Sequence, residues 1–418
     1  MFSYLIEHNR YMNIIGIGLV LLIAYALSHR RTAISSGLIV KALALQFAIG
    51  LFALRTQFGC SLLHSIGEFV ARIYKCADRG TEFIFGNLAN PAGQWGFVFA
   101  IKILPVIIFF GALTSVLFHF KIIQTVVTYI SFAIRPLLGT SGPETLCAIA
   151  NSFLGQTEAP LLIRHYLRSM TKSELFVVMV SGMATISGSI LVAFSMMGVS
   201  ASHMLCASVM AIPGSILIAK MLLPEIEQSS LLQDIDTTPE EPASNNVFDA
   251  IATGTLDGLK LSLNVAAMLI SFVSLLALVN WMLGSGINIV NNLLGNVFPE
   301  GSEIQDIFAF LFKPIGLLFG FVGQDMAIAS KLMGTKLAMN ELIAYSQLMK
   351  SQLSDRAIII LTYALCGFAN FSCIGIQIGG IGALVPEKRH WLTQLGIYAV
   401  IGGTLSNILS AMIASLLL

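Results

Sequence analysis

Charged residues are scarce in this chain. Only 11% of its 418 residues are Asp, Glu, Lys or Arg, whereas soluble globular proteins carry about 25%. One large core cannot account for such a shortage over so long a chain. The hydrophobic content of 56% and the mean hydropathy of +0.84 indicate that much of the surface faces hydrocarbon. Composition therefore predicts an integral membrane protein.

Several functional classes lack their usual sequence signals. The six cysteines form no CxxC pair, which argues against a disulfide framework or a zinc site. The net charge is +1 and no basic block is present, so no nucleic-acid partner is expected. No GxxxxGK, HExxH or GxSxG motif occurs, which excludes the common ATP-binding, metallopeptidase and serine-hydrolase sites.

Long apolar runs take the place of these motifs. A helix needs about 20 apolar residues to cross the hydrocarbon layer. The runs are too long and too uniform for barrel strands, which alternate at every residue. We therefore expect an all-α membrane protein with about eight transmembrane helices, and the first run reads as a retained span. The predicted spans are 11–28, 35–55, 97–118, 174–197, 202–222, 262–284, 356–378 and 393–418.

Two further stretches are apolar but interrupted. Residues 143–170 are broken by polar residues between Asn151 and Pro160, and residues 304–347 are broken near Gly320 to Asp325. Broken backbone at membrane depth survives only where protein or a hydrated cavity satisfies its polar groups. We interpret both stretches as re-entrant helical hairpins. The distribution of basic residues places both termini in the periplasm and the hairpins on opposite sides, which predicts an inverted-repeat transporter core.

These elements suggest four regions. Residues 1–95 hold the N-terminal spans and an interfacial segment, and residues 96–222 form the first half of the core. An acidic hydrophilic linker at 223–249 leads to the second half at 250–418. Further interfacial helices are expected near 61–76, 119–136 and 288–298.

Two glutamates stand at these interruptions. Glu158 follows Gly155-Gln156-Thr157 in the middle of the first hairpin, and Glu341 follows Asn340 in the second. A charge at the bilayer centre costs roughly 2.5–3.5 kcal/mol on insertion scales, so each carboxylate needs a partner or a role. We favour a solute site. The alternatives are ion pairs, of Glu158 with Arg164 or Arg168, and of Glu341 with Lys336 or Lys331.

Smaller polar groups have two readings. Asn370 and Ser372 either face a solute or bond to neighbouring helices, as amides and hydroxyls do in bundles. Asn151 and the stretch from Thr185 to Ser189 offer oxygens to a cation, since an unwound helix exposes carbonyls beside them. The alternative for Thr185 to Ser189 is close helix packing through small residues.

Four motifs in order resemble the concentrative nucleoside transporter family. They are GQTEAPLLIR at 155–164, ATISGS at 184–189, GTKLAMNELIAY at 334–345 and CGFANFSCIG at 366–375. The resemblance covers nearly the whole chain. It implies a sodium-coupled secondary active symporter that imports nucleosides across the bacterial inner membrane. It also implies a multi-pass homotrimer in the lipid bilayer and no enzymatic activity.

The resemblance assigns residues to the site. The nucleobase would contact Gln156, Thr157, Glu158 and Ile190. The ribose would face Glu341, Asn370 and Cys373, with Phe368 nearby. A co-transported sodium ion would be held by Asn151, Thr185 and the carbonyls of Leu154 and Ile186. Because a nucleoside is neutral, the carboxylates would act as hydrogen-bond acceptors.

One position departs from the family pattern, and three alternatives stay open. Cys373 replaces a serine that is frequent there, and a thiol bonds more weakly than a hydroxyl. Some members of the family couple to protons, although Asn151 and Thr185 favour sodium here. The rivals to a transporter are an intramembrane enzyme that uses Glu158 and Glu341 as acid and base, and a passive channel.

Overall fold

The computed structural model is built from helices. It describes residues 7–90, 94–96, 98–227, 246–294 and 303–418, and no strand occurs within these ranges. Residues 228–245 of the predicted linker lie outside them. The first part of the chain contains η1 (Glu7–Asn9), α2 (Arg10–Ala26), η2 (Arg31–Ala33), α3 (Ser36–Arg55), α4 (Gln57–Phe85), η3 (Gly86–Ala89), α5 (Phe99–Lys102), α6 (Leu104–His119) and α7 (Ile122–Leu138).

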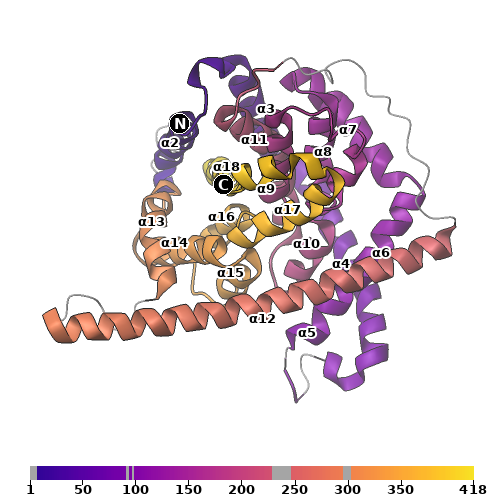
Figure 1. Ribbon diagram of the computed structural model, residues 1–418. Helices are drawn as coiled ribbons and strands as arrows, with labels where there is room; N and C mark the ends of the chain where they lie inside the picture. The colour runs from indigo at the N-terminus through magenta and orange to yellow at the C-terminus, as the bar shows by residue number, and fades with distance from the viewer. Residues whose placement is uncertain (1–6, 91–93, 97, 228–245, 295–302) are drawn as a thin grey trace.

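The remaining elements make up the central bundle and the long helix beside it (Figure 1). They are α8 (Gly142–Ala150), η4 (Ala159–Ile163), α9 (Lys172–Ala184), α10 (Gly188–Met196), α11 (Ala201–Leu222), α12 (Val247–Leu294), α13 (Ile304–Leu318), α14 (Gly323–Ala338), α15 (Glu341–Leu348), α16 (Asp355–Leu365), α17 (Phe371–Leu384), η6 (Pro386–Lys388) and α18 (Arg389–Leu417).

The predicted spans are helical, but not all are continuous. Within the described residues, five helices are long and apolar enough to cross a membrane: Glu7–Ala26, Ser36–Arg55, Ala100–His119, Ala201–Leu222 and Pro386–Leu417. The predicted span 262–284 lies inside α12. The predicted spans 174–197 and 356–378 are each two half-helices, because the backbone unwinds at 185–187 between α9 and α10 and at 366–370 between α16 and α17.

The first predicted hairpin consists of α8, an irregular turn and η4. Ser141 and Glu144 start α8 with a capping box, in which the backbone N–H of Ser141 donates to Glu144 Oε1 at 2.7 Å. The base of the hairpin is held by Lys388, whose ammonium donates to the carbonyl oxygens of Leu167 at 2.9 Å and Met170 at 2.6 Å. The connection between α17 and α18 therefore lies against this base.

The second predicted hairpin differs from the expectation of a single turn. The break near Gly320 is present between α13 and α14, but the chain breaks again at Met339 and Asn340. The second break forms because the Asn340 side chain accepts from the backbone N–H of Ile343 at 3.0 Å and caps a new helix. Glu341 is therefore the first residue of α15 instead of a residue on a continuous limb, and α13 is an additional helix packed on α14.

The same order of elements occurs twice. α8, η4, the broken α9/α10 and α11 are followed later by α14, α15, the broken α16/α17 and α18. The two hairpins lie at opposite ends of α18, a helix of 29 residues. Lys388, just before α18, holds the base of the first hairpin. Ser415, near the end of α18, donates to the carbonyl of Phe319 at 3.2 Å, just before α14. This arrangement is an inverted repeat.

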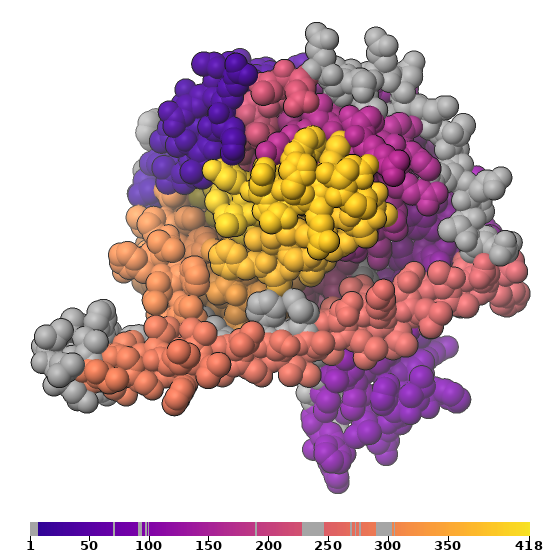
Figure 2. All heavy atoms as spheres, in the orientation of Figure 1, coloured from indigo at the N-terminus to yellow at the C-terminus, as the bar shows by residue number. Residues whose placement is uncertain are grey.

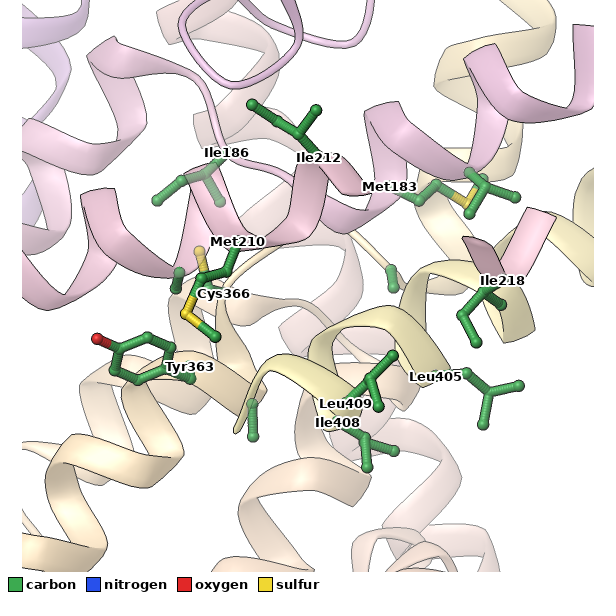
Figure 3. Close-up of a cluster of buried hydrophobic side chains, with 14 of the residues drawn as sticks. Met183, Ile186, Met210, Ile212, Ile218, Tyr363, Cys366, Leu405, Ile408 and Leu409 are labelled. Atoms are coloured by element: carbon green, nitrogen blue, oxygen red, sulfur yellow. The ribbon is translucent and has the colours of Figure 1, made fainter. Parts of the chain in front are cut away.

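The centre of the molecule lies where the two repeats meet. α11 and α18 each have a membrane-length window that is 83% buried, and they pack on each other and on α9 and α16. Figure 3 shows side chains from both broken helices in this core, among them Met183 and Ile186 from the first and Tyr363 and Cys366 from the second. The two breaks therefore lie deep inside the protein.

The long helix α12 runs along one side of the bundle and extends beyond it (Figures 1 and 2). It packs on α6 through glycines, because a Cβ at Gly111 would come within 2.5 Å of the Gly254 carbonyl oxygen and 2.7 Å of Gly258 Cα. The predicted interfacial segments 61–76 and 119–136 lie in α4 and α7. The predicted interfacial segment at 288–298 is not separate: its residues up to Leu294 continue α12, and 295–298 lie outside the described residues.

Candidate functional site

Three half-helices begin at the breaks, and each has a polar cap. Ser187 Oγ accepts from the N–H of Ile190 at 3.4 Å at the start of α10. Asn340 caps α15. Asn370 Oδ1 accepts from the N–H of Cys373 at 3.1 Å at the start of α17. The first turn of a helix carries partial positive charge and free N–H groups, so these starts favour acceptor groups of a solute or a carboxylate.

Glu341 and Asn370 join two of these helix starts. Asn370 Nδ2 donates to Glu341 Oε2 at 2.9 Å, and both side chains are buried. Asn370 Oδ1 also accepts from Ser372 Oγ at 2.6 Å, so the cap and the carboxylate hold the Asn370 amide in one orientation. Each oxygen of a carboxylate has more than one acceptor site, so Glu341 keeps the capacity to accept from a solute hydroxyl.

The turn of the first hairpin reaches the same helix, α17. Gln156 Nε2 donates to Cys373 Sγ at 3.3 Å, and Gln377 Nε2 donates to Gln156 Oε1 at 3.0 Å. Gln377 Nε2 also donates to the carbonyl oxygen of Met179 at 2.9 Å. Because a carbonyl only accepts, this bond fixes the Gln377 amide, which in turn requires Gln156 to present its oxygen to Gln377. The Gln156 NH₂ group therefore faces Cys373.

Thr157 and Glu158 lie in the same turn but make fewer contacts. Thr157 is exposed, and a Cβ at Gly380 of α17 would come within 2.8 Å of its methyl carbon. Glu158 is half-buried and its Oε2 lies 3.5 Å from the backbone N–H of Gly155. In the described chain neither residue bonds to Glu341. The two carboxylates are thus connected only indirectly, through Gln156 and α17.

The two predicted apolar residues flank the breaks. Ile190 is buried in the first turn of α10. Phe368 is half-buried in the unwound segment between α16 and α17, and its carbonyl oxygen accepts from the N–H of Asn370 at 2.8 Å. Both residues therefore lie next to capped helix starts.

The predicted sodium ligands gather where the first hairpin meets the break in α9/α10. The N–H of Gly188 donates to the carbonyl oxygen of Phe153 at 3.0 Å, which joins the two backbones. Asn151 Nδ2 donates to Ser181 Oγ at 3.0 Å, and Thr185 Oγ1 donates to the Ser181 carbonyl at 2.8 Å. Leu154 and Ile186 are buried beside them.

Asn151 leaves one oxygen unused. Its Oδ1 is buried and has no hydrogen-bond partner in the described part of the protein. A buried acceptor without a partner costs about 1–3 kcal/mol. An amide oxygen next to the carbonyls of unwound backbone is the type of ligand that a sodium ion binds. The residues present therefore fit the ion.

Three of the four cations named as alternative partners make other contacts in the described structure. Lys336 donates to the Ala364 and Cys366 carbonyls and to Asn407 Oδ1, at 3.1, 3.4 and 2.9 Å, and no ion pair joins it to Glu341 within 4 Å. Lys331 lies 3.1 Å from Asp306, and Arg168 lies 3.0 Å from Glu387. The alternatives that paired Lys336 or Lys331 with Glu341, and Arg168 with Glu158, are therefore wrong.

Two residues of this region were missed from the sequence. Gln377 fixes Gln156, and Asn407 on α18 holds the end of the first broken helix, since its Nδ2 donates to the Ala184 carbonyl at 2.7 Å. Gln377 did carry a signal, because it interrupts an apolar run and lies four residues after Cys373, on the same helix face. Gly367, with a φ of +109°, completes this contact: a Cβ there would come within 2.6 Å of the Ala184 carbonyl oxygen.

The chemistry of the region is that of recognition. It offers a carboxylate, amide groups and a thiol, which suit a neutral polar solute. In the described ranges, no group of three His, Cys, Asp or Glu side chains is placed to hold a metal.

Known families match the three parts of the chain. The family described as "Na+ dependent nucleoside transporter N-terminus" matches residues 15–88, "Nucleoside recognition" matches residues 100–201, and "Na+ dependent nucleoside transporter C-terminus" matches residues 203–415.

Three curated relatives are named as transporters or permeases. The nucleoside permease NupC of Helicobacter pylori is 38% identical over 415 residues, covering 97% of each chain. An uncharacterized transporter of Haemophilus influenzae is 42% identical over 413 residues, again covering 97% of each chain. The sodium/nucleoside cotransporter 1 of Rattus norvegicus is 36% identical, covering 96% of this chain and 63% of that protein.

Solved structures share the whole fold. CNTnw in an inward-facing substrate-bound state superposes with a TM-score of 0.90 at 36% identity, with 97% of each chain covered. A double variant of CNTnw in an outward-facing state gives a TM-score of 0.89 at 35% identity, with 98% of this chain and 97% of that chain covered. The likeness is to a transporter, so the alternative of an intramembrane enzyme is wrong. The chain belongs to the concentrative nucleoside transporter family.

Proposed function

We propose that the protein is a sodium-coupled symporter that imports nucleosides across the bacterial inner membrane. The observation that carries this proposal is the unpartnered Asn151 Oδ1, next to the junction between the first hairpin and the break before α10. An ion bound there would contact the hairpin whose next polar residues, Gln156 to Glu158, face the solute. Ion and solute would thus stabilise the same arrangement of the hairpin, which is the basis of coupling.

The solute site would lie between Gln156 and Glu341. Gln156 would donate to an acceptor of the nucleobase, with Thr157 and Glu158 in the same turn and Ile190 packed against the ring. Glu341 would accept from a ribose hydroxyl, held in place by Asn370. Cys373 lies between the two parts, in contact with Gln156, and Phe368 would border the sugar.

The sodium gradient is sufficient for accumulation. One ion moving down about 100 mV releases roughly 2.3 kcal/mol, and a tenfold concentration ratio adds about 1.4 kcal/mol. The sum supports a gradient of a few hundred-fold. A passive channel would collapse such a gradient, so uptake against one separates the two.

Uptake into proteoliposomes tests the proposal. Sodium and proton gradients are imposed separately, and radiolabelled uridine and adenosine are supplied to each. We expect accumulation with sodium alone, and we expect Asn151→Ala to raise the sodium concentration needed for half-maximal uptake. Asn13→Ala is the matched control, since Asn13 is also buried with an unpartnered Oδ1, but in the unbroken helix α2. An unchanged sodium response in Asn151→Ala would move the ion elsewhere.

Proton coupling is the second candidate. It is favoured by one observation: Glu341 is a buried carboxylate without an ion pair in the described chain, and such a group is able to carry a proton. Accumulation with a proton gradient in sodium-free buffer would select this candidate. Glu341 would be the carrier if Glu341→Gln still exchanges nucleoside across the membrane without a gradient but no longer accumulates it with a proton gradient.

A trimer in the bilayer completes the proposal. Large apolar side chains are exposed on α4, α7 and α12, where they would contact lipid or a second copy of the chain; examples are Phe58, Phe83, Tyr129, Phe132 and Trp281. Native mass spectrometry of the detergent-solubilised protein measures the number of copies. A dominant monomer would remove the trimer from the proposal.

A further inference from the structure

Lys336 is a buried cation that no carboxylate neutralises within 4 Å in the described structure. Its side chain is 3% exposed, and its Nζ contacts three oxygens: Ala364 O, Cys366 O and Asn407 Oδ1. All three can only accept at these atoms. An ammonium has three hydrogens and no lone pair, so the three acceptors match its charged form. A buried charge is costly unless its surroundings are built for it.

The position of Lys336 in the second repeat corresponds to that of Asn151 in the first. Asn151 lies five residues before Gln156, and Lys336 lies five residues before Glu341. Each is at the end of a hairpin's first helix, and each reaches the last turn of a broken helix. Asn151 contacts Ser181 of α9, and Lys336 contacts the end of α16.

The two positions differ in what the side chain supplies. Asn151 supplies an oxygen that lacks a protein partner, as a site for a free ion requires. Lys336 supplies the positive charge itself. It takes two carbonyl oxygens at the negative end of α16 and one amide oxygen, which are ligands of the kind a sodium ion uses. The position in the second repeat that corresponds to the proposed sodium site therefore already holds the Lys336 ammonium.

We propose that the Lys336 ammonium is a tethered cation in this second site, and that it limits transport to one free sodium ion per nucleoside. The inference rests on the proposed sodium site at Asn151. Asn407 connects the two positions, because its Oδ1 accepts from Lys336 while its Nδ2 holds the Ala184 carbonyl at the end of α9. A variant without the ammonium would leave these three oxygens without their donor, and a sodium ion would take its place.

The test is sodium-dependent thermal unfolding of the full-length protein. Lys336→Gln is made alone and with Asn151→Ala, which disables the first site. The double variant is expected to unfold at a temperature at least about 2 °C higher in sodium chloride than in choline chloride. The Asn151→Ala single variant is expected to lose this difference. Lys331→Gln in the same background is the matched control, because it removes a half-exposed lysine from the same helix.

A double variant that folds but unfolds at the same temperature in both salts would overturn the proposal. A wild-type protein without any sodium response would instead refute sodium coupling, and the double variant would still report on the second site. If Lys336→Gln folds in neither salt, the wild-type stoichiometry decides. Proteoliposomes clamped at known potentials give the sodium-to-nucleoside ratio: a ratio of one supports the tethered cation, and a ratio of two refutes it.

Discussion

The Asn370 amide donates to the buried carboxylate of Glu341 at 2.9 Å and so ties the start of α17 to the start of α15. Each residue lies in a different break of the second repeat. The amide that donates to the carboxylate is itself fixed by its cap on α17, so Glu341 would lose a bond from a fixed donor if it turned away. The acceptor is thereby preorganised for a donor on the solute.

Glu341→Gln is expected to weaken nucleoside uptake strongly. An amide in this place offers only one acceptor oxygen and turns its NH₂ toward either Asn370 or the solute. Loss of one such bond costs about 1–3 kcal/mol, or roughly 5- to 150-fold in apparent affinity. Concentration-dependent uptake measures the change, with expression checked by fluorescence. Glu68→Gln, an exposed change on α4, is the control. Normal uptake in Glu341→Gln would remove this residue from the site.

Glu158→Gln is expected to reduce uptake without loss of expression. The carboxylate lies in the turn of the first hairpin, and within the described ranges its one hydrogen bond is a long contact of 3.5 Å to Gly155 N. Little in the fold depends on it, so the change should affect transport more than stability. Uptake and unfolding temperature are compared on the same preparation. A lowered unfolding temperature with unchanged uptake would assign Glu158 to the fold instead.

Cys373→Ser is expected to sharpen sugar selectivity. A hydroxyl bonds more strongly than a thiol and replaces the contact with Gln156 Nε2. Selectivity is measured as the concentration of 2′-deoxyuridine or 3′-deoxyuridine that halves labelled uridine uptake, divided by the concentration of unlabelled uridine that does so. This ratio should rise for at least one of the two analogues. Cys206→Ser, at another buried cysteine, is the control. Unchanged ratios would place the sugar away from position 373.

Gln377→Leu is expected to alter base selectivity more than sugar selectivity. Without Gln377, the Gln156 amide is free to turn over and to present oxygen or nitrogen to the base. Bases with an acceptor at the edge that faces Gln156 should then no longer bind better than bases with an amino group at that edge. Competition between uridine and cytidine measures this shift. Gln46→Leu removes another buried glutamine, which bonds to Ser410, and should leave the ratio unchanged.

Most of the fold can be predicted from the sequence, because the length and hydropathy of an apolar run identify a membrane helix. The turn at Asn340 was missed, although an asparagine followed by glutamate is a helix-start signal. The glycine break at Gly320 is the more visible interruption of the apolar stretch and by itself indicates a single turn. A hydropathy window cannot tell one turn from two within an amphipathic stretch.

The site was predictable where polar residues interrupt apolar runs. Gln156 and Glu341 stood out for that reason, and their links to Cys373 and Asn370 follow from the structure. Sequence spacing predicts only that Lys336 pairs with Glu341, because it shows a nearby carboxylate and not distant carbonyls. Its real acceptors come from α16 and α18, and no local pattern reports contacts so far apart in the chain.

Gly367 sets a limit on how this chain can diverge. Its backbone adopts a φ of +109° and leaves no room for a Cβ beside Ala184 and Asn407, whereas Gly375 and Gly379 in α17 have no atom within 4 Å of such a carbon. Alanine is therefore tolerable at the latter two positions but not at the first. Of these three glycines, Gly367 alone has to be kept for the two broken helices to meet, and nothing in the described fold prevents a small side chain at Gly375 or Gly379.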